Sequence, residues 1–292
     1  MRLGHVLERR LPVLVVSPLF AISLFFVYGF ILWTLWISFT DSGVMPRYEL
    51  TGLDQYDRLW ATPRWTVAIR NLGIFSTLFI AISLALGLLL AVLLDQRVRA
   101  EGLIRTIYLY PMALSFIVTG TVWKWMLNPG LGLERLVREA GWEGFSFDWL
   151  VDPQMAIYTV VIAGVWQSSG YAMALFLAGL RSVDDEVIRA AAIDGAGPMR
   201  TYMSIVLPML RPVFLSTVII LAHLAIKSFD LVIALTGGGP GYATDMPATF
   251  MYAFAFQRSE LGVAAASAIM MLATVVAIIV PYLYSELRQG RA

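Results

Sequence analysis

The sequence contains no cysteine, two histidines and two lysines. Without cysteine, the 292-residue chain can form no disulfide and hold no metal through thiolates, and His5 and His223 do not stand in a metal-ligand spacing. A phosphate-binding loop needs a Gly-Lys step, but Lys124 follows a tryptophan and Lys227 follows an isoleucine. We therefore expect no catalytic residue, metal or cofactor in this chain, and any ATPase that serves it to be a separate subunit.

Charge is also scarce. Charged residues make up 14% of the chain and hydrophobic residues 59%, whereas soluble domains have about 25% and 45–50%. The excess of apolar residues indicates an integral membrane protein. The net charge of +1 gives no reason to expect a nucleic acid as partner.

Long uncharged stretches predict the helices. Crossing about 30 Å of hydrocarbon takes roughly 20 helical residues. Stretches of this kind predict transmembrane helices at about 12–40, 72–94, 107–127, 154–180, 212–236 and 261–285. The predicted fold class is therefore all-α, with six transmembrane helices in a single domain that covers residues 1–292.

The arginines predict the orientation. Twelve of them fall in the two terminal segments, the segment after the second helix and segment 181–211, while seven fall in the longer segments on the other side. Because basic residues accumulate on the cytoplasmic side, we expect both termini and segment 181–211 to be cytoplasmic.

Segment 181–211 carries signals for two short helices. The acidic residues 184–186 suit the first turn of a helix, Gly195 suits its end, and Pro198 suits the first turn of the next helix. The residues alone leave two interpretations open: a solvated connector between transmembrane helices, or a docking surface at which the small alanines 190–192 let a partner approach closely.

Polar residues inside the predicted helices are candidates for a substrate pathway, because ionisable groups are costly in a membrane. Lys227 and Asp230 are three residues apart on one helix face, although they would also neutralise each other there. Lys124 lies near a helix end, from which its ammonium group could extend to the interface instead.

A polar break in the fourth predicted helix contains Trp166, Gln167 and Tyr171. Aromatic faces and amide or hydroxyl groups are the chemistry that binds sugars. Such residues also pack transmembrane helices together and mark membrane interfaces, so both interpretations remain open.

Segment 189–212 resembles the cytoplasmic EAA loop of binding-protein-dependent ABC importer permeases. The matching residues are Arg189, Ala190, Ala191, Asp194, Gly195 and Ala196, followed by Ile205-Val206-Leu207-Pro208. Arg189 departs from the family pattern, which has Glu. Phe229-Asp230 and Leu235-Thr236-Gly237-Gly238-Gly239-Pro240 resemble the fifth helix of carbohydrate-uptake permeases, in particular the first of the two paired subunits of maltose or glycerol-3-phosphate importers.

The resemblance implies a heterodimer with a second permease subunit, a dimer of ATP-binding subunits that holds ATP and Mg, and a periplasmic or lipid-anchored sugar-binding protein. It implies a multi-pass protein of a bacterial or archaeal cytoplasmic (inner) membrane, in contact with lipid. The EAA-like residues, from Arg189 to Ala196, would dock on the ATPase and couple it to alternating access.

Two alternatives differ in substrate or energy source. A phosphorylated polyol such as glycerol-3-phosphate would call for several cationic groups along the pathway, and only Lys124 and Lys227 qualify. An ion-coupled secondary transporter, using Lys227, Asp230 and His223, would show internal repeats with matching broken helices, which are not evident in the sequence.

Overall fold

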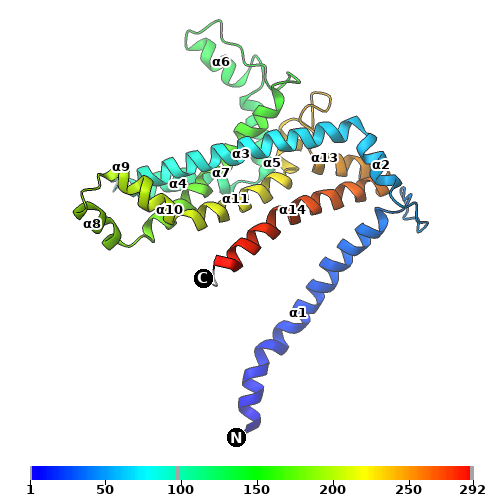
Figure 1. The fold of residues 1–292 in the computed structure, drawn as a ribbon. Helices are drawn as coiled ribbons and strands as arrows, with labels where there is room; N and C mark the ends of the chain where they lie inside the picture. The colour runs from blue at the N-terminus through cyan, green and yellow to red at the C-terminus, as the bar shows by residue number, and fades with distance from the viewer. Residues whose placement is uncertain (1, 97–98, 290–292) are drawn as a thin grey trace. The chain divides into compact units, whose positions relative to one another are not determined.

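The computed structural model describes residues 2–96 and 99–289, with side chains for 16–96, 99–281 and 284. These residues are helical apart from loops and one isolated antiparallel bridge between Thr40 and Leu50 (Figure 1). Four helices are long and apolar enough to cross a membrane, or up to six if each of two bent helix pairs counts as one span. This agrees with the predicted all-α membrane class.

The chain divides into two compact units, the first made of Met1–Thr62 and Met251–Met270. This unit contains α1 (Arg2–Ile37), α2 (Asp54–Ala61), the π-helical turn η2 (Ala253–Gln257) and the start of α14 (Leu261–Gln289). In α1, the stretch Val16–Ile37 is an apolar candidate span that is almost entirely exposed in the single chain. An apolar helix that is exposed over most of its length is suited to contact with lipid or another subunit.

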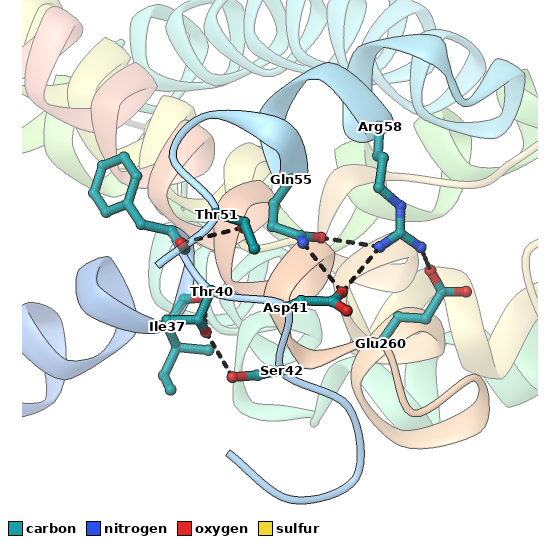
Figure 2. A network of polar contacts seen from close by, with 9 residues as sticks. Ile37, Thr40, Asp41, Ser42, Thr51, Gln55, Arg58 and Glu260 are labelled. Atoms are coloured by element: carbon teal, nitrogen blue, oxygen red, sulfur yellow. Dashed lines mark hydrogen bonds and ion pairs between the residues drawn. The ribbon is translucent and has the colours of Figure 1, made fainter. Parts of the chain in front are cut away.

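Polar contacts join α2 to both chain segments of the first unit (Figure 2). The Arg58 guanidinium forms ion pairs with Glu260 (2.8 Å) and Asp41 (3.5 Å), and it also donates to the Gln55 amide oxygen (3.2 Å). The Arg58 side chain is half exposed, so each pair contributes at most about 1 kcal/mol. The contacts therefore fix the orientation of α2 more than they stabilise the fold.

The second unit, Pro63–Phe250 with Met271–Ala292, holds most of the bundle. Its helices are α3 (Pro63–Asp95), α4 (Glu101–Ala113), α5 (Phe116–Met126), α6 (Gly132–Glu139), α7 (Ala156–Arg181), α8 (Asp185–Ile193), α9 (Pro198–Thr201), η1 (Tyr202–Val206), α10 (Leu207–Met209), α11 (Arg211–Ile226), α12 (Asp230–Leu235) and α13 (Pro247–Tyr252). The last two residues of α13 belong to the first unit. Figure 1 shows α3, α7 and α11 side by side, with α8 and α9 beyond one end of α3.

Glycines let the helices of the second unit approach closely. Helix α7 is the central helix, with 72% of its apolar window buried, and α3 packs along it with Gly87 against Ala172 and Met173. Gly170 of α7 lies against the backbone carbonyl of Tyr108 in α4. Lipid gives apolar side chains no reason to cluster, so close backbone packing of this kind holds transmembrane helices together.

Two of the predicted helices are not continuous, and that part of the prediction is wrong. The stretch 107–127 is split into α4 and α5, which meet at 101°. Leu114 is extended there, and the Ser115 hydroxyl accepts a hydrogen bond from the backbone N–H of Val118, so that α5 starts afresh. The stretch 212–236 is broken between α11 and α12.

A third predicted helix, 72–94, is longer in the structure than in the prediction, because α3 already begins at Pro63.

A buried carboxylate organises the loop between α5 and α7. Glu134 of α6 accepts hydrogen bonds from the backbone N–H groups of Gly130 (3.1 Å) and Phe147 (3.2 Å), and it pairs with Arg138 (2.7 Å). The two N–H groups, followed by the Arg138 charge, lower the pKa of Glu134. The charged carboxylate therefore ties both ends of the loop to α6 at neutral pH.

The packing of α4 on α7 predicts the effect of a single methyl group. In Gly170→Ala the new Cβ would overlap the Tyr108 carbonyl, which is backbone and cannot rotate away. We expect destabilisation of at least about 1–3 kcal/mol, measured as a lower Tm in detergent. The matched control is Gly73→Ala in α3, where nothing lies near the added Cβ; equal Tm values for the two variants would contradict this packing.

Candidate functional site

The break after α11 places two charges at a gap in the helical backbone. Lys227 follows the last residue of α11 and Asp230 is the first residue of α12, with Ser228 and Phe229 between them. Both charged residues are exposed, and among the described residues no ion pair joins them. They flank a break, whereas the sequence predicted them on one face of a continuous helix.

The break borders a cavity of about 130 Å³. Its lining consists of Phe75, Phe79, Phe116, Gly164, Leu224, Lys227, Ser228, Phe229, Asp230 and Leu231. Helices α3, α5, α7, α11 and α12 all contribute to this lining. The cavity thus lies where five helices meet, with apolar walls and a few polar groups, as is usual for ligand sites.

A stacked aromatic pair forms one wall of the cavity. The rings of Phe75 and Phe79 lie 5.1 Å apart with an interplanar angle of 9°, and Gly164 of α7 faces both rings. We did not predict these residues from the sequence. Their four-residue spacing puts them on one face of α3, but the same spacing is common in any packed apolar helix, so it did not single them out.

The other pathway candidates lie elsewhere. Trp166 packs edge-to-face on Trp123 and lines a separate apolar groove of about 500 Å³. Gln167 is buried and its amide donates to the carbonyl of Leu114 (2.8 Å), which compensates the break between α4 and α5. Lys124 and Tyr171 line neither the cavity nor the groove. Of the six candidates, the structure brings together only Lys227 and Asp230.

Segment 181–211 forms the predicted helix–turn–helix. The Asp184 carboxylate accepts from the backbone N–H of Glu186 (2.9 Å) and caps α8. Gly195 follows with φ +80°, and Pro198 opens α9. A left-handed φ suits glycine, which has no Cβ to clash with the backbone.

The side chains that resemble the EAA motif differ in exposure. Arg189, Ala190, Asp194 and Gly195 are exposed, whereas Ala191 is buried under the turn and its carbonyl accepts from the N–H of Ala196. Ile193 next to them is 86% exposed. An apolar side chain this exposed at the tip of a helix is available for contact with another molecule.

A family model for the inner membrane component of binding-protein-dependent transport systems matches residues 83–289. This chain belongs to that family. The match includes the cavity-lining break and the whole of segment 181–211, so both features lie in the permease domain that defines the family.

Three relatives match the permease over most of its length. A probable ABC transporter permease of Pyrococcus horikoshii is 42% identical, and the match covers 89% of each chain. The xylose/arabinose import permease XacH of Haloferax volcanii is 39% identical over 90% of this chain and 84% of the relative. The sn-glycerol-3-phosphate permease UgpA of Pectobacterium atrosepticum is 31% identical over 92% of each chain.

A solved structure shares the fold. It is a crystal structure of a bacterial ABC transporter involved in the import of the acidic polysaccharide alginate, with a TM-score of 0.84, 20% sequence identity and coverage of 99% of both chains. The permease is therefore a multi-helical inner-membrane component of an ABC importer, with the fold of such permeases.

Proposed function

We propose that this permease carries a sugar across a bacterial or archaeal cytoplasmic membrane as one of two permease subunits of an ATP-driven importer. A binding protein delivers the sugar on the outer side, and a dimer of ATP-binding subunits on the inner side holds ATP and Mg. Alternating access opens the pathway to one side at a time as the ATPase closes and reopens. The permease itself supplies the pathway and the contact with the ATPase.

The assignment of a sugar as substrate rests on the cavity at the helix break. The buried Phe75 and Phe79 give the cavity an apolar lining that suits the C–H groups of a sugar, and Lys227 and Asp230 offer a donor and an acceptor to its hydroxyl groups. At about 130 Å³ the cavity is smaller than the roughly 300 Å³ at which ligand pockets begin. It therefore suits part of a sugar.

Relatives of both substrate classes match the chain, so the charge of the cavity decides between them. A phosphorylated polyol carries a doubly charged group that favours clustered cations. Here Lys227 is accompanied by Asp230, which would repel a phosphate. A neutral sugar fits this balance, and the xylose/arabinose permease is also the more similar relative. Membership in a binding-protein-dependent family argues against the ion-coupled alternative.

We further propose that both termini and segment 181–211 are cytoplasmic and that this segment contacts the ATPase. The arginine distribution supports the orientation. The exposed Arg189, Ala190 and Ile193, together with the tight turn at Gly195, support the contact. Because Arg189 replaces the usual Glu of the EAA motif, its counterpart on the ATPase should be acidic.

Co-purification tests the assembly directly. The chain is tagged in its native host and extracted in mild detergent, and the proteins bound to it are identified. We expect a second permease of similar size and an ATPase with a phosphate-binding loop. Recovery of the chain alone, from membranes in which transport is active, would contradict the proposal.

The cavity assignment predicts the effect of neutralising one lysine. Lys227→Met should lower maximal uptake of the delivered sugar by about tenfold or more, because a hydrogen bond to a charged group contributes about 1.5–3 kcal/mol and 1.4 kcal/mol is tenfold. The matched control is Lys124→Met, which removes the other lysine, outside the cavity. Uptake that is unchanged in Lys227→Met, or equally reduced in both, would remove Lys227 from the pathway.

The turn at Gly195 predicts a backbone effect on coupling. Gly195→Val forces a β-branched residue into the left-handed region, which costs about 1–2 kcal/mol, so the turn should rearrange and uptake should be lost while the chain still inserts into the membrane. The control is Gly197→Val, because Gly197 has φ −70°, which valine adopts, and open space around it. Normal ATP-driven uptake by Gly195→Val would refute the role of the turn.

A further inference from the structure

Helix α3 is the longest uninterrupted helix of its unit. It runs for 33 residues, from Pro63 to Asp95, with no proline after its first position. At 1.5 Å per residue it is about 50 Å long, compared with about 30 Å of hydrocarbon. Its two ends therefore extend beyond the apolar layer, where polar side chains can form strong contacts.

The N-terminal end of α3 is held by a buried ion pair. The Arg64 guanidinium contacts both carboxylate oxygens of Asp245, at 2.5 Å and 3.2 Å, and also lies 4.5 Å from the centre of the Tyr242 ring. Asp245 is 1% exposed and Arg64 15% exposed at the side chain. A two-point contact between these planar groups fixes orientation as well as distance.

Two further side chains complete this attachment. The Asn71 amide, two turns along α3, donates to the backbone carbonyls of Ala243 and Asp245, both at 2.9 Å. The Thr249 hydroxyl donates to the Asp245 carboxylate (2.6 Å). The loop 236–246 is therefore bound to α3 through its main chain and its side chains. This loop follows α12, which begins at the cavity with Asp230.

The C-terminal end of α3 is attached to segment 181–211. The Tyr202 hydroxyl donates to the carboxylate of Asp95, the last residue of α3 (2.7 Å), and accepts from the Gln96 amide (3.3 Å). Tyr202 begins η1, directly after the helix–turn–helix. One unbroken helix thus contacts segment 181–211 at one end and the loop 236–246 at the other.

We propose that α3 is a strut that transmits movement of segment 181–211 to the loop 236–246, with Tyr202–Asp95 and Arg64–Asp245 as its two attachments. This inference rests on the proposed function of segment 181–211. An unbroken helix packed along α7 shifts or tilts as a rigid body, whereas the broken α4–α5 and α11–α12 can bend. Because Phe75 and Phe79 lie on the same helix, its displacement also moves the aromatic wall of the cavity.

The two attachments act as positioning residues, because neither touches the cavity. If they served stability alone, their loss would lower the Tm but leave the amount of sugar transported per ATP unchanged. If they transmit movement, their loss lowers this ratio while ATP hydrolysis continues. The ratio therefore separates the two roles.

The absence of cysteine gives a second readout. In Ala243→Cys, the single thiol of this chain lies in the loop 236–246, and its labelling by a membrane-impermeant maleimide reports on that loop. In the full reconstituted complex, with the binding protein loaded with xylose or arabinose, we expect the labelling rate to change when ATP is added. Tyr202→Phe and Arg64→Gln, each in this background, should lose that change.

The same two variants should lower the sugar transported per ATP by at least about fivefold, the lower range of typical coupling between distant sites. Tyr158→Phe is the matched control, because it removes a tyrosine hydroxyl from α7 for which the structure gives no hydrogen bond. If the complex with Tyr202→Phe loses the ATPase on purification, Arg64→Gln alone tests the strut, because Arg64 lies at the opposite end of α3 from segment 181–211. An unchanged labelling response and an unchanged ratio in Arg64→Gln would overturn the strut. Absence of ATP-driven uptake in the unsubstituted complex would instead refute the proposed function.

Discussion

Hydrocarbon offers no hydrogen-bond partners to the backbone, so every break in a membrane helix must be compensated by the protein or by water. This constraint explains where polar residues stand in an otherwise apolar chain. At the break between α4 and α5, the Gln167 amide binds the Leu114 carbonyl and Ser115 caps the next helix. At the break after α11, Lys227, Ser228 and Asp230 line a cavity. The first break is closed by protein groups, and the second faces the space in which we expect the substrate.

The same constraint distinguishes the continuous helices from the broken ones. Helices α3 and α7 keep their backbone bonds internal and pack through glycines such as Gly87 and Gly164, so they form a stiff pair. The contacts that attach α3 to the loop 236–246 and to segment 181–211 lie at its ends, where Arg64 meets Asp245 and Asp95 meets Tyr202. A helix pair that moves as one body beside two spans that can bend is suited to a transporter, because movement at one end reaches the other while the bendable parts open the pathway.

The sequence predicted well what depends on composition and local backbone chemistry. Charge-free stretches indicated the membrane class, and Gly195 with Pro198 placed the turn of segment 181–211 where the structure has it. It failed at the break after α11, because neither proline nor glycine marks residues 227–229, and Lys227 and Asp230, three residues apart, are also compatible with a continuous helix. Phe75 and Phe79 were missed since a cavity wall is made by helices distant in sequence. Partner contacts of Gln167 and Asp245 likewise arise only from the tertiary fold.

We propose that ATP drives the binding-protein-dependent import of a sugar through this permease. The most direct measurement is uptake of labelled xylose or arabinose into proteoliposomes that contain the purified complex, with the binding protein outside and ATP inside. We expect accumulation that requires both ATP and the binding protein and does not respond to an imposed ion gradient. Accumulation driven by an ion gradient without ATP, or uptake that is independent of the binding protein, would contradict it.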